Sequence, residues 1–214
     1  ERVGSTARAE LERSLKRMGV DHINLIQLHN LVEPDEWATA FNKGGVVEAL
    51  NQARAEGLVS FIGVTGHGLR IPSMHLRSLA EFDFDTVLFP FNHSLLSIDQ
   101  YRDDVSALRD LCRARNIATQ TIKAVARRRW DDGTGGHRSW YEPLTDTDAI
   151  QRAVRYVLSQ PDLFLNTTSD ATLLPFILDA AQGDLTRPLD EEMNRDIAEF
   201  GVTPLFDGAA LDRI

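Results

Sequence analysis

The chain has 214 residues, 43% of them hydrophobic, and a formal net charge of −9. It is long enough to bury one sizeable core, and its acidity argues against non-specific nucleic-acid binding, which requires a basic surface. With one cysteine, Cys112, and no apolar run of the roughly 18 residues that a membrane helix requires, we expect a cytoplasmic protein that binds neither membrane nor nucleic acid.

The first element combines a helix pattern with a strand pattern. Apolar residues at helical spacing between Leu11 and Met18 predict an amphipathic helix that ends at Gly19. The nearly continuous apolar run 23–28 is typical of a strand that is buried on both faces. The run stops at His29, and ligands of α/β folds bind beyond the carboxyl ends of the strands. His29 is therefore a candidate functional residue.

The same alternation of helix and strand continues along the chain. Apolar runs predict four more strands, at Val59–Thr65, Thr86–Phe91, Ile117–Ala124 and Leu163–Asn166. Helical periodicity predicts helices at about 46–57, 72–79, 100–115, 145–157, 171–178 and 190–200. Strict alternation of this kind predicts parallel strands joined by right-handed crossovers.

Three segments lack a clear period. Residues 31–43 predict a loop with room for one helical turn, and residues 201–214 form a C-terminal tail. Residues 126–143, rich in Arg, Trp and Gly, predict a long irregular loop, and such loops in compact domains are usually either functional or disordered. Thr145 and Asp170 stand where the N-caps of the following helices are expected.

A partial barrel fits this pattern best. No Gly-x-Gly-x-x-Gly fingerprint follows the early strands, which weakens a doubly wound dinucleotide-binding fold. A (β/α)8 TIM barrel fits the unit lengths, but five units cannot close it. We expect one α/β domain over residues 1–214 that contains strands 4 to 8 of such a barrel, with three units preceding Glu1 and loop 126–143 at the barrel mouth.

Two stretches resemble the aldo-keto reductase family specifically, and a third resembles it moderately. LERSLKRMGVDHINLIQLH at 11–29 is similar to the family signature that ends in His, and EALNQARAEGLVSFIGVTGH at 48–67 resembles its Glu-Gly…Ile-Gly-Val-Ser-Asn stretch. LFLNTTSDATLL at 163–174 resembles the last barrel strand and the helix that binds the adenosine end of the cofactor. The resemblance implies an enzyme that uses NADP, or NAD, to reduce an aldehyde or ketone by hydride transfer.

The resemblance assigns one catalytic residue. The family tetrad is Asp, Tyr, Lys and His, and of these the His alone has a matching position, His29. In the family this imidazole orients and polarises the substrate carbonyl. The Asp, the Tyr that donates the proton and the Lys belong to strands that would precede Glu1. As given, the chain therefore lacks its proton donor.

Four cofactor positions near the nicotinamide follow from the same resemblance. Thr65 matches a Ser that hydrogen-bonds the carboxamide, whereas Gly66 stands where the family has Asn. Leu88 replaces a Gln, for which Asn92 would compensate in part. Lys123, or Ile122, falls where many members stack a Tyr on the nicotinamide.

Four further positions would contact the phosphates. Arg127 and Arg128 follow the fourth strand, where the pyrophosphate loop of the family runs, and arginine suits phosphate geometry. Ser169 and Asp170 precede a helix amino terminus, an anion site in general, although Asp170 would repel a 2′-phosphate. The choice between NADP and NAD therefore stays open.

Each assignment has a simpler structural alternative, and the function has two rivals. His29 could be a hydrogen-bonded residue, the Arg127–Arg129 run a solvated loop, and Asp170 only an N-cap. His29, His67 and His93 follow consecutive strands, as in metal-dependent barrel hydrolases, but no His-x-His or His-Glu-x-x-His spacing occurs and we predict no metal site. A non-catalytic nucleotide-binding subunit is the other rival, since Gly66 and Leu88 depart from the family.

Overall fold

A single parallel sheet organises the chain. The structure is a computed structural model that describes residues 1–131 and 136–208. The sheet has the order β1-β2-β3-β4-β7, and its strands are β1 Ile23–Leu28, β2 Val59–Thr65, β3 Thr86–Pro90, β4 Ala118–Ile122 and β7 Leu163–Leu165. All neighbouring strands in it are parallel. The five strands and the parallel topology expected from the sequence are confirmed.

Helices precede, separate and follow the strands of this sheet. They are α1 Gly4–Met18, α2 Pro34–Phe41, α3 Val46–Ala55, α4 Ile71–Glu81, α5 His93–Leu96, α6 Asp99–Arg115, α7 Thr147–Leu158, α8 Leu174–Gln182 and α9 Asp190–Phe200, with a 3₁₀ turn η1 at Ala171–Leu173. As predicted, α1 ends at Gly19, whose φ of 70° is the left-handed conformation that glycine adopts without strain. None of the helices in the described part of the chain has the length and apolarity needed to cross a bilayer.

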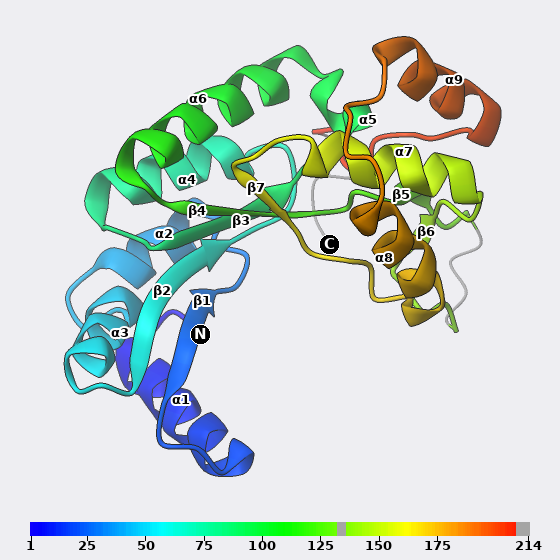
Figure 1. Ribbon diagram of the computed structural model, residues 1–214. Helices are drawn as coiled ribbons and strands as arrows, with labels where there is room; N and C mark the ends of the chain where they lie inside the picture. Colours follow the sequence, from blue (N-terminus) through cyan, green and yellow to red (C-terminus); the bar gives the residue numbers. More distant parts are fainter. Residues whose placement is uncertain (132–135, 209–214) are drawn as a thin grey trace.

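The sheet is curved, with α3, α4 and α6 on its convex side (Figure 1). Alternate residues of β2 and β3, among them Ile62, Val64 and Phe89, are fully buried against these helices. Phe61 of β2 and Phe164 of β7 lie on the other face and are 51% and 62% exposed. The convex side therefore holds the core, while the concave side is open.

This arrangement corresponds to part of a barrel. Each strand lies beside the next strand of the repeat, and within the described residues β1 and β7 each pair with a single neighbour of the sheet. On the concave face, Gln27 Nε2 donates hydrogen bonds to Thr86 Oγ1 at 3.1 Å and to Gln120 Oε1 at 3.3 Å. The expected partial (β/α)8 barrel fold is confirmed.

Two of the segments without a period form regular structure. Residues 34–41 form α2, which begins at Pro34 and stacks Trp37 on Phe41 with ring centroids 4.4 Å apart, so a loop with one turn is wrong there. In segment 126–143, β5 Ala126–Arg129 pairs antiparallel with β6 Tyr141–Pro143, so a wholly irregular loop is also wrong. Residues 132–135 of that segment and 209–214 of the tail lie outside the described residues.

The helix caps differ slightly from expectation. Asp146, not Thr145, caps α7, because its carboxylate accepts a hydrogen bond from the Ala149 N–H at 2.9 Å. Asp170 caps η1 by accepting from the Thr172 N–H at 3.0 Å, and η1 leads directly into α8.

Candidate functional site

Two histidines meet at the carboxyl edge of the sheet. His29 follows β1 and is exposed, and its ring centroid lies 6.1 Å from that of the half-buried His67, which follows β2. Burial lowers the pKa of His67 to about 4, and the nearby charges of Lys123 and His29 act in the same direction. His67 is therefore neutral at neutral pH, beside an imidazole that faces solvent.

Asn30 ties the two strand ends together. Its φ of 52° is left-handed, which Asn tolerates better than most residues. Its side-chain oxygen accepts a hydrogen bond from the His67 N–H at 3.1 Å, and its own N–H donates to Thr65 Oγ1 at 3.1 Å. Sequence reasoning missed Asn30, although an Asn directly after a strand is a recognisable turn signal.

Thr65 and Gly66 are shaped by their protein neighbours. The Thr65 hydroxyl oxygen is engaged by Asn30, and the side chain is only 8% exposed. At Gly66 a Cβ would lie 2.0 Å from Cδ1 of the buried Ile71 and 3.3 Å from Cγ2 of Val32. The side chain of Ile71, the first residue of α4, therefore fills the space that an Asn side chain at position 66 would occupy.

Lys123 is the most unusual residue at this edge. Its backbone is left-handed, with φ 70°, which is uncommon for a residue other than glycine and often marks a functional position. Its Nζ lies 4.6 Å from the ring centroid of Trp140 and 4.9 Å from that of Tyr141. Burial lowers its pKa to about 8, so the ammonium is retained at neutral pH by a small margin.

Asn92 holds the Lys123 backbone in place. Its side-chain N–H donates to the Lys123 carbonyl oxygen at 2.9 Å, while its side-chain oxygen accepts from the Leu95 N–H at 2.9 Å and caps α5. The amide is thus largely satisfied within the protein, which favours a positioning role over a direct cofactor contact.

Arg127 and Arg128 share one carboxylate. Arg127 Nη1 and Arg128 Nε each lie 2.6 Å from an oxygen of Glu142, across the β5 and β6 hairpin. Arg127 also donates to the carbonyl oxygen of Phe200, and the Thr203 N–H donates to the Arg127 carbonyl oxygen at 2.8 Å. These arginines therefore fasten the hairpin and the segment after α9.

Ser169 and Asp170 lie beyond β7. The Ser169 hydroxyl donates to the carbonyl oxygen of Arg138 at 3.0 Å, and Arg138 Nη1 lies 3.6 Å from Asp170 Oδ1. The Thr172 hydroxyl and N–H lower the pKa of Asp170, so the residue is ionised at neutral pH. The contacts of both side chains are therefore local and stabilise the chain at the start of η1.

The third histidine of the metal hypothesis lies elsewhere. His93 Nε2 is 2.9 Å from Asn194 Oδ1 of α9, and its ring packs edge-on to Tyr156, on the outer side of the sheet. Among the described residues, no three His, Cys, Asp or Glu side chains form a group that could hold a metal ion. The convergence of His29, His67 and His93 expected of a barrel hydrolase is therefore wrong.

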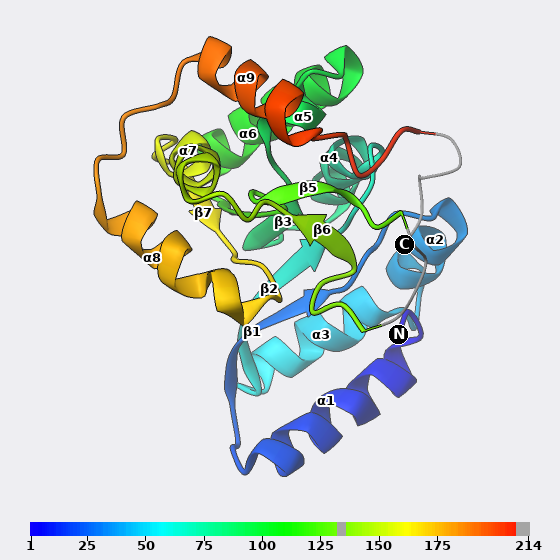
Figure 2. The ribbon, with the colours of Figure 1, turned by 90° about the vertical axis from the view of Figure 1, so that its right-hand side faces the viewer.

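The hairpin and the segment after α9 lie together at the carboxyl ends of the strands (Figure 2). Leu205 and Phe206 are almost completely buried, and the Phe206 ring centroid is 6.2 Å from that of Trp140. Arg129 Nε donates to the Leu205 carbonyl oxygen at 2.9 Å. Sequence analysis left this segment as a tail because an extended run of mixed polarity has no period to detect.

The side chains at this edge can donate hydrogen bonds and supply positive charge. An exposed imidazole at His29 can donate a hydrogen bond to an oxygen, and a half-buried ammonium at Lys123 provides a positive charge in a poorly solvated place. The aromatic rings of Trp140 and Tyr141 flank that charge. The arrangement suits an oxygen-bearing ligand on which negative charge develops.

A family sequence model matches more than half of the chain. The sequence model of the Aldo/keto reductase family matches residues 4–133. A D-threo-aldose 1-dehydrogenase from a Pseudomonas species is 30% identical over 89 residues, which is 42% of this chain and 25% of that protein.

Solved structures share the fold at low identity. A Pseudomonas aeruginosa protein assigned to the aldo-keto reductases has a TM-score of 0.58 at 18% identity, covering 85% of this chain and 60% of that one. An aldo-keto reductase from Bacillus halodurans has a TM-score of 0.58 at 15% identity, covering 96% and 71%. A Bombyx mori aldo-keto reductase solved with NADP has a TM-score of 0.55 at 17% identity, covering 99% and 66%.

The chain thus spans a quarter of the curated relative and 60% of the Pseudomonas aeruginosa structure. The family match extends over more than half of the chain, from α1 through β5, and includes the strand ends that carry His29, Thr65 and Lys123. This chain belongs to the aldo/keto reductase family.

Proposed function

We propose that this chain serves an NADP-dependent oxidoreductase that interconverts a small carbonyl compound and its alcohol, with reduction of an aldehyde or ketone as the forward reaction. The observation that carries the proposal is the cluster of side chains at the carboxyl edge of the sheet. There the ring centroids of His29 and His67 are 6.1 Å apart, and the side chain of Lys123 is half buried. Membership of the family and the NADP bound in the Bombyx mori relative support it.

The cluster fits a nicotinamide dinucleotide in part. Lys123 offers a fixed positive charge next to the ring of Trp140, which is 38% exposed. The Thr65 hydroxyl retains its hydrogen for donation after its oxygen has accepted from Asn30. Arg127 and Arg128 pair with Glu142, so a cofactor phosphate would have to displace that carboxylate to bind them. Ser169 and Asp170 would lie at the adenosine end of the cofactor.

When bound, the reduced nicotinamide supplies the hydride. His29 would donate a hydrogen bond to the substrate carbonyl oxygen, which polarises the carbonyl and stabilises the negative charge that develops on that oxygen. The proton that this oxygen then takes up would come from water, because the Tyr that donates it in the family has no matching position in this chain. His67, neutral because of its burial, limits the positive charge around His29. Lys123 adds a longer-range positive potential at the same edge.

NADPH titration followed by tryptophan fluorescence, then turnover of an aldehyde panel followed by NADPH absorbance, tests the proposal. Saturable binding with turnover that falls in His29→Ala supports it, and we expect this turnover to be slow, because the Tyr that donates the proton in the family has no matching position in this chain. Binding without turnover would favour a nucleotide-binding subunit, for which the commitment of Asn92, Arg127 and Arg128 to internal contacts is the supporting observation. Absence of NADPH binding would refute both functions.

The charge of Lys123 gives a sharper test. Because burial lowers its pKa to about 8, the ammonium is lost as the pH rises through that value. We expect the affinity of the chain for NADPH to fall between pH 7 and pH 9, and this dependence to disappear in Lys123→Met. Lys16→Met, on the exposed face of α1, is the matched control and keeps the dependence. An unchanged pH dependence in Lys123→Met would exclude Lys123 from the cofactor site.

A further inference from the structure

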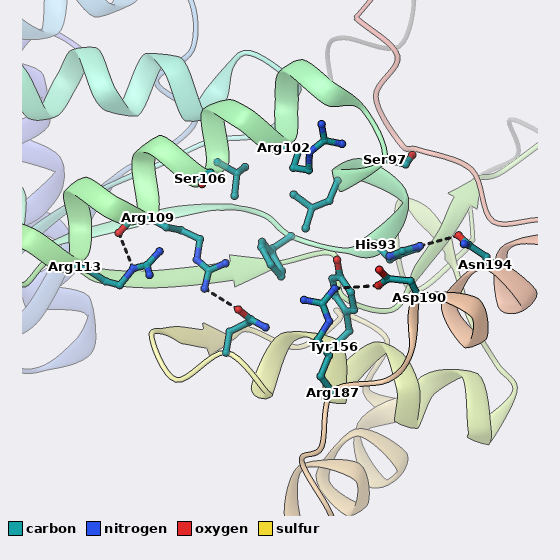
Figure 3. Close-up of a pocket in the computed structure, with 14 residues that line it drawn as sticks. His93, Ser97, Arg102, Ser106, Arg109, Arg113, Tyr156, Arg187, Asp190 and Asn194 are labelled. Atoms are coloured by element: carbon teal, nitrogen blue, oxygen red, sulfur yellow. Dashed lines mark hydrogen bonds and ion pairs between the residues drawn. The ribbon is translucent and has the colours of Figure 1, made fainter.

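A cavity lies on the outer side of the sheet, away from His29 and Lys123. It encloses about 490 Å³ between α5, α6, α7 and the start of α9 (Figure 3). Small-molecule sites commonly have volumes of about 300–1,000 Å³. Four arginines line it, Arg102, Arg109, Arg113 and Arg187, with Asp190 as the one carboxylate among its described lining residues. We call this cavity the arginine pocket.

Helix α6 builds one wall of the arginine pocket. Arg102, Ser106, Arg109 and Arg113 are spaced i, i+4, i+7 and i+11, which places them on one face of the helix. Like charges at i and i+4, as at Arg109 and Arg113, are unfavourable in an isolated helix. Aspartates offset this row of charge: Arg102 pairs with Asp99 and Asp103, and Arg113 pairs with Asp110 and, at 3.6 Å, with Asp162.

Arg109 is committed to the structure. Its Nε and Nη2 contact the two carboxylate oxygens of Asp162 at 3.0 and 2.7 Å, and Nη2 also donates to Gln160 at 3.0 Å. The side chain is only 15% exposed. Arg109 therefore joins α6 to the segment before β7, and the edge of its guanidinium formed by Nε and Nη2 is occupied by Asp162.

The other three arginines are differently placed. Arg102, Arg113 and Arg187 are 50%, 51% and 49% exposed, and their principal partners Asp99, Asp110 and Asp190 are 85%, 70% and 67% exposed. Exposed pairs of this kind contribute at most about 1 kcal/mol each. A divalent oxyanion, which guanidinium groups bind through paired hydrogen bonds, can displace these partners.

The floor of the arginine pocket is aromatic. Phe91 and Tyr156 are 3% and 5% exposed, and their ring centroids are 5.9 Å apart. The guanidinium of Arg187 lies over the Tyr156 ring at 4.9 Å. Because the Arg187 guanidinium covers the Tyr156 ring, an anionic head that draws Arg187 toward itself would let an apolar or planar part of the same ligand lie against that ring.

We propose that the arginine pocket binds a small organic phosphate ester, at a site distinct from the candidate cofactor site. A phosphate ester carries a charge of about −1.5 to −2 near neutral pH, so it competes with the aspartate partners of these guanidinium groups better than a singly charged carboxylate does. The cavity shares no lining residue with the cluster of His29, Thr65 and Lys123.

The two sites are nevertheless joined through consecutive residues. Phe91 and His93 line the arginine pocket, and Asn92 between them donates a hydrogen bond to the Lys123 carbonyl oxygen at 2.9 Å. A ligand in the arginine pocket therefore contacts the segment that holds the Lys123 backbone.

Isothermal titration of the 214-residue chain with phenyl phosphate, at fixed ionic strength, tests the proposal. We expect one saturable site, with weaker binding of inorganic phosphate, which lacks the ring, and of benzoate, which lacks the phosphate. Arg113→Gln and Arg187→Gln should each weaken binding by about tenfold, as the loss of a charge-assisted hydrogen bond does. Arg13→Gln is the matched control, because Arg13 is 61% exposed and pairs with Glu10 at i,i+3 as Arg113 does with Asp110.

Three results would overturn the proposal. Equal phenyl phosphate binding by the wild type and both pocket variants would place the ligand elsewhere, and tighter binding of benzoate would make the pocket a carboxylate site. A loss of NADPH affinity in Arg113→Gln and Arg187→Gln would make the pocket part of the cofactor site. Melting temperatures of the two variants, whose substituted side chains are half exposed, verify that the fold is retained.

Discussion

At the scale of single residues, Gly66 shows how a departure from a family pattern acquires a structural reason. The sequence suggests a lost amide contact to the cofactor, whereas the structure shows a position with no room for a side chain. A Cβ there would approach Ile71 Cδ1 to 2.0 Å and Cγ1 to 2.4 Å, and Ile71 is fully buried. The glycine and the isoleucine are therefore a matched pair.

We predict that Gly66→Ala destabilises the chain by about 1–3 kcal/mol, the usual cost of overpacking a core. Ile71→Ala removes both clashing atoms, so the double variant should be more stable than the sum of the two single changes implies. Urea denaturation measures these free energies. Gly183→Ala, where the nearest atoms to the new Cβ are 3.6 and 3.7 Å away, should be tolerated, and strict additivity at positions 66 and 71 would contradict the explanation.

His75 gives a prediction about pH. It is fully buried on α4, its Nε2 lies 2.9 Å from the Leu88 carbonyl oxygen, and burial lowers its pKa from 6.5 to about 4. Because the unfolded chain binds the proton first, the free energy of unfolding should fall as the pH drops from about 6.5 to 4, by roughly 3 kcal/mol from this residue. Below pH 4 its contribution levels off.

His75→Gln keeps a side-chain donor but cannot titrate, so denaturation curves between pH 7 and pH 4 should be flatter than those of the wild type. His67, whose pKa is also lowered to about 4, retains part of the slope in this variant. An identical slope in both proteins would show that His75 is not protonated on unfolding in this range.

At the scale of elements, the hairpin of β5 and β6 is held by charge rather than by a periodic apolar pattern. Glu142 of β6 forms ion pairs with Arg127 and Arg128 of β5, and its side chain is 17% exposed. The segment after α9 then pairs its Thr203 N–H with the Arg127 carbonyl oxygen. The carboxylate therefore joins the two strands of the hairpin, and Arg127 joins the hairpin to the segment after α9.

We expect Glu142→Gln to loosen this hairpin, because the amide cannot accept two guanidinium groups as a carboxylate does. Limited digestion with trypsin should cut faster after Arg127, Arg128 or Arg129, with the cleavage sites identified by mass spectrometry. Glu10→Gln, which removes the exposed partner of Arg13 on α1, should leave this rate unchanged. Equal protection of the hairpin in wild type and Glu142→Gln would mean that the apolar contacts of Tyr141 suffice.

At the scale of the whole molecule, the open concave face of the sheet determines how the chain is expected to behave in solution. Phe61 and Phe164 are 51% and 62% exposed there, and within the described residues β1 and β7 present edges without a further strand. Exposed apolar side chains and unpaired strand edges favour association with other chains. The apolar side chains on the convex side are covered by α3, α4 and α6 (Figure 1).

The 214-residue chain by itself should therefore associate in solution. Light scattering coupled to size exclusion should give a mass above that of one chain, and the double variant Phe61→Lys, Phe164→Lys should move it toward the monomer. Val20→Lys changes a residue that is 44% exposed at the end of α1 and should have no effect. A monodisperse wild-type monomer would contradict this expectation.

The local patterns determined the elements and the family. Alternating helical and strand periods located the five strands of the sheet, and the stretches around His29 and Thr65 identified the aldo-keto reductases, because both signals depend on residues close together in the chain. Only the tertiary structure decided what the site residues contact. Asn92 reaches Lys123, Arg127 reaches Glu142 and Ile71 fills the space at Gly66 across gaps in sequence that no period spans. The arginine spacing on α6 is visible in the sequence, but α7 and the residues around α9 are needed to enclose a cavity beside it.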